Sequence, residues 1–96
     1  WCHTISNAEV VCIALLWRES DFTKTIARAV MAGFDTDCNG ATVGSLWGMM
    51  HGVRGIPPVW TKPIEDQFQT TVAGYHNYSI SRMADEMVEL AIKYKP

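Results

Sequence analysis

The sequence lacks any run of basic residues. Its 96 residues carry eight Lys and Arg against ten Asp and Glu, which gives a formal net charge of −2. A protein that binds the phosphate backbone of nucleic acid needs a positively charged face. Nucleic acid is therefore not an expected partner.

Long apolar runs are missing as well. The main uncharged apolar stretch, Gly40 to Met50, is far shorter than the roughly 20 residues that span a bilayer. No basic segment followed by an apolar one opens the chain, as a secretory signal would. We therefore expect no membrane partner.

Cysteines are few, and their number is odd. Cys2, Cys12 and Cys38 stand at irregular spacing, whereas a disulfide framework needs pairs and an oxidising compartment. They are typical of free thiols in a cytoplasmic protein. Neither the closely spaced cysteine pair nor the closely spaced histidine pair of a zinc site occurs. The chain begins at Trp1 rather than Met, which indicates processing or a piece of a longer protein.

Helical signals fill most of the chain, and no segment alternates as a strand does over several residues. Ser6 or Asn7 can cap a first helix that runs through Glu19, and Asp21 can cap a second that ends at Gly33. We expect a single helical segment over residues 1–96, with an all-α fold of the orthogonal-bundle type.

The remaining elements follow from glycine, proline and apolar spacing. A third helix is predicted over 37–53, closed by the Arg54-Gly55-Ile56-Pro57-Pro58 segment. Residues 64–78 are ambiguous and suggest a short helix and a loop. An apolar stripe with terminal lysines predicts a last helix from Ile80 to Tyr94.

Four glycines recur every fourth residue in the third predicted helix, from Gly40 to Gly52. Each interior glycine costs a helix about 0.5–1 kcal/mol relative to alanine. We expect that a neighbouring helix backbone approaches this stripe closely, with a ligand in the groove as the alternative. On either interpretation the helix should be deeply buried.

The segment from Gly33 to Gly40 carries the clearest chemistry. Its carboxylates, Asp35 and Asp37, precede the glycine helix. They could simply cap that helix, because its amino end carries a partial positive charge. They could instead hold a hard cation through oxygen ligands. A calcium loop beginning at Asp35 is the less well supported kind of cation site. The twelfth position of such a loop needs a bidentate Glu, and here it is Leu46.

The combination G-F-D-T-D, the small-residue helix and then I-P-P-V-W at 56–60 resembles the C-terminal part of the ADP-ribosylglycohydrolase family. This is the family of dinitrogenase-reductase-activating glycohydrolases and J1 crystallins, and the resemblance covers nearly the whole chain. It implies an all-helical fold, with two divalent ions, usually Mg²⁺ or Mn²⁺, in a central cleft. It also implies cleavage of the glycosidic bond that joins ADP-ribose to a protein side chain or small molecule.

By this resemblance, Asp35, Asp37 and Cys38 are the candidate metal ligands. The third family ligand here is generally a threonine hydroxyl, so Cys38 departs from the pattern. A thiol is a softer ligand and suits Mg²⁺ poorly.

The family domain is several times longer, and the acidic T-D-D motif of its N-terminal half has no counterpart here. The chain therefore resembles a hydrolase fragment with half a metal site. We expect it to be inactive alone, and to form a homo-oligomer or to require a complementing chain. ADP-ribose or an ADP-ribosylated substrate is the expected ligand. The alternative is a non-catalytic helical protein that self-associates or binds a protein partner.

No catalytic or substrate-binding residue can be assigned from spacing, because catalytic triads are recognised by geometry. His51, beside the glycine stripe, favours a packed histidine over a general base. Trp60, after Pro58, could line the rim of a cleft, but is otherwise expected to fill a core.

Overall fold

A computed structural model describes residues 1–95. These residues divide into two compact units, one from Trp1 to Pro57 and one from Pro58 onward. The chain is mostly helical, which confirms the predicted all-α class, with one small two-stranded sheet in addition. The expectation of a single segment over residues 1–96 stays a prediction.

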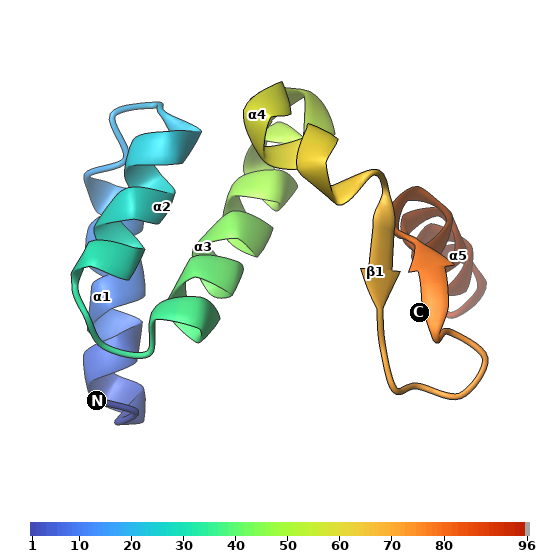
Figure 1. Ribbon diagram of the computed structural model, residues 1–96, viewed down its shortest axis with the longest axis horizontal. Coiled ribbons are helices and arrows are strands. Elements are labelled where there is room, and N and C mark those ends of the chain that lie inside the picture. Colours follow the sequence, from blue (N-terminus) through green and yellow to red (C-terminus); the bar gives the residue numbers. More distant parts are fainter. Residues whose placement is uncertain (96) are drawn as a thin grey trace. The chain divides into compact units, whose positions relative to one another are not determined.

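Three helices, α1 (Thr4–Leu16), α2 (Phe22–Met31) and α3 (Thr36–His51), form the first unit and pack on one another (Figure 1). A short 3-10 turn, η1 (Val53–Gly55), follows α3. The centre of this core is a cluster of small side chains, one from each helix: Ala14, Ala29 and Val43. Small residues at these positions allow the three helices to approach one another.

The helix ends in this unit have local causes. The Asp21 side chain accepts a hydrogen bond from the backbone N–H of Lys24 at 3.0 Å, as predicted for the cap of α2. Gly33 follows α2 with φ +74°, a conformation that glycine adopts without strain. The predicted bounds of the first helix were wrong, because His3 is the cap and Glu19 lies in a turn with φ +51°.

The glycine stripe of α3 faces side chains rather than a helix backbone. A Cβ added at Gly40 would meet Val30 Cγ2 at 3.4 Å, and one at Gly44 would meet Ile26 Cδ1 at 3.7 Å. Nothing lies within 4 Å of the corresponding position at Gly48. The prediction of a close backbone approach was therefore wrong. Deep burial is also limited to part of α3, namely Asn39, Val43 and Trp47.

The second unit contains α4 (Pro58–Thr61), η2 (Lys62–Ile64), β1 (Gln67–Gln69), β2 (Asn77–Ser79) and α5 (Ile80–Lys93). The two strands pair antiparallel (Figure 1). Phe68 stands opposite Tyr78 in this pairing. The short helix predicted within 64–78 was wrong, because the 3-10 turn η2 ends at Ile64 and a β-hairpin follows it. The helix predicted from Ile80 to Tyr94 is confirmed as α5, with Ser79 as its cap.

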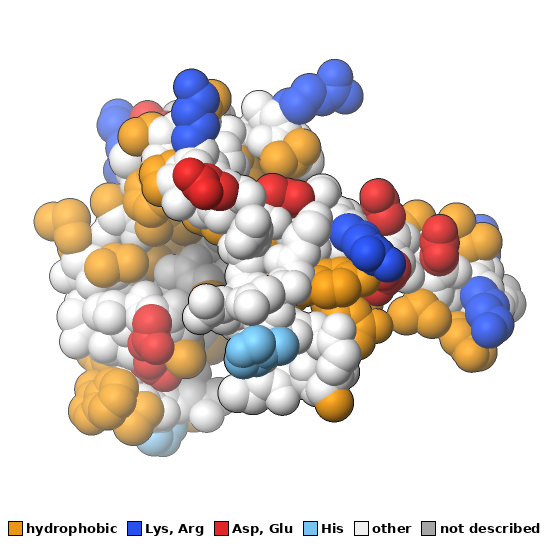
Figure 2. Space-filling model, turned by 45° about the vertical axis from the view of Figure 1, so that its right-hand side comes forward, with side chains coloured by type: hydrophobic (Ala, Val, Ile, Leu, Met, Phe, Trp, Pro, Cys, Tyr) orange, Lys and Arg blue, Asp and Glu red, His pale blue; other side chains and the backbone are white. Residues whose placement is uncertain are grey.

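Apolar side chains are exposed on both units. In the second unit no described side chain is fully buried, and α5 exposes Met87, Val88, Leu90 and Ile92 by half or more. Figure 2 shows hydrophobic side chains reaching the surface between charged ones. None of the described helices has both the length and the apolarity that crossing a bilayer requires.

Candidate metal site at the start of α3

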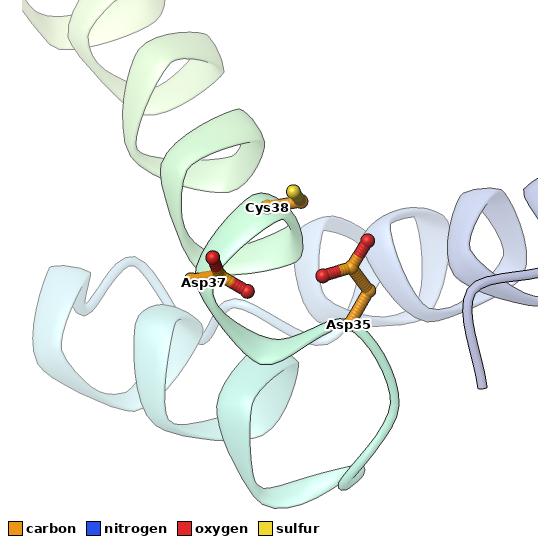
Figure 3. A group of neighbouring side chains, drawn as sticks. All are labelled: Asp35, Asp37 and Cys38. Carbon is orange, nitrogen blue, oxygen red and sulfur yellow. The ribbon is translucent and has the colours of Figure 1, made fainter.

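The three side chains predicted as metal ligands gather at the first turn of α3. The carboxylate oxygens of Asp35 and Asp37 and the sulfur of Cys38 all lie within 4.8 Å of one another. Figure 3 shows the three side chains around the start of the helix, with the carboxylates of Asp35 and Asp37 facing each other. Asp35 is half-buried, whereas the other two are exposed, so an ion can reach the group from solvent.

The carboxylate of Asp35 is not used to cap the helix. Asp35 stands at the N-cap position, yet its side chain makes no capping hydrogen bond to the backbone N–H groups of α3. A capping aspartate would normally accept such a bond. This observation weakens the interpretation in which Asp35 merely ends the loop and begins the helix.

Asp37 is held in its charged form. Hydrogen bonds from its own backbone N–H and from the N–H of Cys38 lower the pKa of the Asp37 carboxyl below its ordinary value. These N–H groups belong to the amino end of α3, where carboxylates are stabilised. Asp37 is therefore a charged oxygen ligand at neutral pH.

Cys38 is held in its neutral form, in contrast to Asp37. A hydrogen bond to Asp35, together with the negative charge of both aspartates, raises the pKa of the Cys38 thiol above its ordinary value. Negative neighbours disfavour the thiolate because they repel a further negative charge. In the absence of a cation, this thiol is therefore protonated at neutral pH.

Two asparagines position the site, and sequence reasoning missed both roles. The side-chain oxygen of Asn7, in α1, accepts from the backbone N–H of Asp35 at 3.0 Å and from the amide of Asn39 at 2.7 Å. Asn39 is buried in α3, with 3% of its surface exposed. Asn7 lies inside α1 and does not cap it, contrary to the prediction. An asparagine inside a helix is a weak helix former, and that signal could have indicated a tertiary role.

An open groove of about 420 Å³ lies beside the group, between α1 and the start of α3. Its walls carry mainly small side chains, both polar and apolar, from both helices, among them Thr4, Asn7, Val11, Cys12 and Thr42. Asp35 and Cys38 line its edge. A ligand held by these two residues would therefore have space for a bulky attached group.

The donor set fits one divalent ion rather than two. Carboxylate oxygens are the ligands that Mg²⁺ and Mn²⁺ prefer, and Mg²⁺ commonly takes one or two of them and keeps waters. Asp35 and Asp37 satisfy this requirement, whereas the thiol of Cys38 does not. Within residues 1–95 no other group of three such ligands occurs. The calcium-loop alternative is wrong, because residues 36–40 are helical and do not form an open loop.

The remaining candidates lie apart from this group. The ring of His51, at the other end of α3, packs on the Trp47 ring with 4.4 Å between centroids, as expected for a packed histidine. The three cysteines form no disulfide in the described chain. No catalytic base is identified by these contacts.

Comparison with known proteins assigns the chain to a family. A family profile of the ADP-ribosylglycohydrolases matches residues 1–95. The ADP-ribosylarginine hydrolase Tri1 of Pseudomonas putida (strain GB-1) is 35% identical over 49 residues, which cover 51% of this chain and 13% of that hydrolase. The chain thus spans a small part of the length of that relative. No solved structure gives a significant match. Because the profile covers nearly all of its residues, the chain belongs to the ADP-ribosylglycohydrolase family.

Proposed function

We propose that this chain is the metal-binding part of a hydrolase that removes ADP-ribose from a protein side chain or a small molecule. The observation that carries the proposal is the meeting of Asp35, Asp37 and Cys38 at the start of α3, in a chain whose residues 1–95 match the family. The similarity to an ADP-ribosylarginine hydrolase makes an ADP-ribosylated arginine the first substrate to test.

In this proposal, Asp35 and Asp37 hold one Mg²⁺ or Mn²⁺. When bound, such an ion polarises oxygen ligands and lowers the pKa of a coordinated water. The chain's own contribution is positional: Asn7 fixes the backbone of Asp35, and the amino end of α3 keeps Asp37 charged. The groove beside them offers space for the nucleotide part of the substrate.

The test combines metal binding and hydrolysis. Titration calorimetry of the 96-residue chain with Mn²⁺, with and without ADP-ribose, should show binding that ADP-ribose strengthens. Asp35→Ala with Asp37→Ala should abolish it, and Asp85→Ala, an exposed acid in α5, should not. In a polypeptide that completes the domain, the double variant should also lose metal-dependent release of ADP-ribose from ADP-ribosylarginine. Unchanged binding and activity in the double variant would contradict the assignment.

We also propose that further polypeptide completes the site. Two carboxylates and one thiol support one ion only, and the 49 residues that match the hydrolase relative cover 13% of its length. The second unit leaves a largely apolar groove of about 210 Å³ between the hairpin and α5, lined by side chains that include Phe68, Met83, Met87 and Leu90. Such uncovered apolar surface favours association. The additional polypeptide would be the remainder of the family domain, whether it lies in the same chain or in a separate one.

A non-catalytic protein that self-associates is the competing function, and the same exposed side chains of α5 favour it. Sedimentation of the isolated chain distinguishes the two. Self-association without Mn²⁺ or ADP-ribose binding supports the non-catalytic protein, whereas ion binding that depends on Asp37 supports the hydrolase. A stable monomer with a high melting temperature would contradict both the self-association and the need for further polypeptide.

A further inference from the structure

The third ligand position of the site holds sulfur. Cys38 lies in the first turn of α3, and its Sγ is within 4.8 Å of the ligand oxygens of Asp35 and Asp37. It is exposed and lines the open groove, so neither burial nor a disulfide blocks its access to an ion. In Figure 3 its sulfur lies on the side of the helix start that Asp35 also occupies.

This donor set suits some divalent ions far better than others. Mg²⁺ takes oxygen ligands in octahedral geometry and has little affinity for sulfur. Zn²⁺ and Co²⁺ accept a thiolate together with carboxylates, and Zn²⁺ does so in four-coordinate sites. Bond lengths of about 2.1 Å to oxygen and about 2.3 Å to sulfur put two tetrahedral ligands about 3.5 Å apart. The exposed side chains of Asp37 and Cys38 can make up the difference from 4.8 Å by rotation.

The charges around the site also favour an ion that binds sulfur. The amino end of a helix carries a partial positive charge that opposes a cation. Asp35 and Asp37 offset this effect, and a thiolate at Cys38 would add a third negative ligand where a hydroxyl would add none. This third negative ligand strengthens the binding mainly of ions that bind sulfur well.

We propose that Cys38 gives this site a preference for thiophilic divalent ions, Zn²⁺ or Co²⁺, over Mg²⁺. The inference rests on the proposed function, because it assumes that Asp35 and Asp37 hold an ion. It concerns which ion they hold, and it assigns that selection to Cys38.

The experiment uses Co²⁺ as a spectroscopic probe of the 96-residue chain. A thiolate ligand produces a sulfur-to-cobalt charge-transfer band, which carboxylates alone do not. The wild-type chain should show this band, and Cys38→Ser should lose it. Cys12→Ser is the matched control, because Cys12 is an exposed cysteine of the same groove outside the ligand group, and it should keep the band.

Calorimetry then measures the preference itself. Cys38→Thr should weaken Zn²⁺ binding by about tenfold or more and leave Mg²⁺ binding equal or stronger. Circular dichroism of each variant checks that the fold is kept. We expect the fold to be kept because Cys38 is exposed. If Cys38→Thr binds Zn²⁺ as tightly as the wild type, the inference fails while the metal site stands. If the wild type binds none of Mg²⁺, Mn²⁺, Co²⁺ and Zn²⁺, the proposed metal role fails with it.

Discussion

The side-chain oxygen of Asn7 accepts a hydrogen bond from the backbone N–H of Asp35 at 3.0 Å, across 28 positions of the sequence. The same oxygen accepts from the buried amide of Asn39, and the Asn7 amide donates to the carbonyls of Trp1 and His3. One side chain thus connects the start of the chain, α1 and the first turn of α3. The position of the candidate metal site depends on this connection.

Replacement of Asn7 should therefore disturb both stability and ion binding. Asn7→Ala leaves the buried Asn39 amide without its partner, which costs about 1–3 kcal/mol. Asn7→Asp keeps the acceptor oxygen for Asp35 and Asn39 and removes only the amide that donates to the carbonyls of Trp1 and His3. Urea unfolding followed by circular dichroism measures the free energy, and Mn²⁺ titration measures the site. Asn77→Ala, an exposed asparagine of β2, is the control. Equal unfolding free energies for Asn7→Ala and the wild type would contradict this role.

The proximity of the three candidate ligands follows from their local sequence, whereas the contacts that position them come from another helix. Asp35, Asp37 and Cys38 come together because they share one helix start, so their proximity is encoded by adjacent positions. The partner of Asp35 lies in another helix, and no local pattern in the sequence indicates which asparagine would bond there.

The hairpin was missed for a related reason. Its strands are three residues each, too short for alternation to be visible, and Phe68 is flanked by two glutamines. Their pairing is supported by Asp66, which bonds to Ser79 and Ser81 on the far side of the turn. The long helices α2 and α5 were predicted well because apolar spacing and capping residues agree there.

The open space at Gly48 predicts that alanine stabilises α3. Nothing lies within 4 Å of an added Cβ, so Gly48→Ala should raise the unfolding free energy by about 0.5–1 kcal/mol through helix propensity. Gly55 gives the opposite case, because an added Cβ would lie 2.4 Å from His51 Cβ. Gly55→Ala should lower stability by about 1–3 kcal/mol. Thermal melting of both variants tests the pair, and a destabilised Gly48→Ala would show that the glycine stripe faces a neighbour.

Trp47 is expected to be the side chain on which the first unit depends most. It is 3% exposed, its ring packs edge-on against Phe22 at 5.8 Å, and its Nε1–H donates to the carbonyl of Gly55 at 2.9 Å. Trp47→Ala should cost about 3–5 kcal/mol, and Trp47→Phe less, because the ring packing is partly kept. Trp17→Ala is the control, since Trp17 is 61% exposed and only its backbone carbonyl accepts from Arg28. Chemical denaturation that ranks Trp17→Ala as the more damaging change would overturn this assignment.

Acid should weaken the second unit through Asp66. Its carboxylate accepts hydrogen bonds from the hydroxyls of Ser81 and Ser79 and from the backbone N–H of Ser81, and these lower the pKa of the Asp66 carboxyl below its ordinary value. A carboxyl whose pKa is lowered by folding binds its proton more readily when unfolded. Its stabilisation is therefore complete above the ordinary carboxyl pKa and is lost as the pH falls through the lowered value.

The neutral variant Asp66→Asn separates this effect from general acid sensitivity. Asp66 has φ +57°, and asparagine tolerates this left-handed conformation, so the backbone should be kept. Asp66→Asn should melt at a lower temperature than the wild type at pH 7, and the difference should shrink as the pH falls below the ordinary carboxyl pKa and the wild-type carboxylate takes up its proton. Asp85→Asn, in the exposed part of α5, should follow the wild type over the same pH range. The measurement is the helical circular-dichroism signal of α5 during thermal melting. If the difference in melting temperature between Asp66→Asn and the wild type stays constant across this pH range, the charge of Asp66 does not stabilise the hairpin and the start of α5.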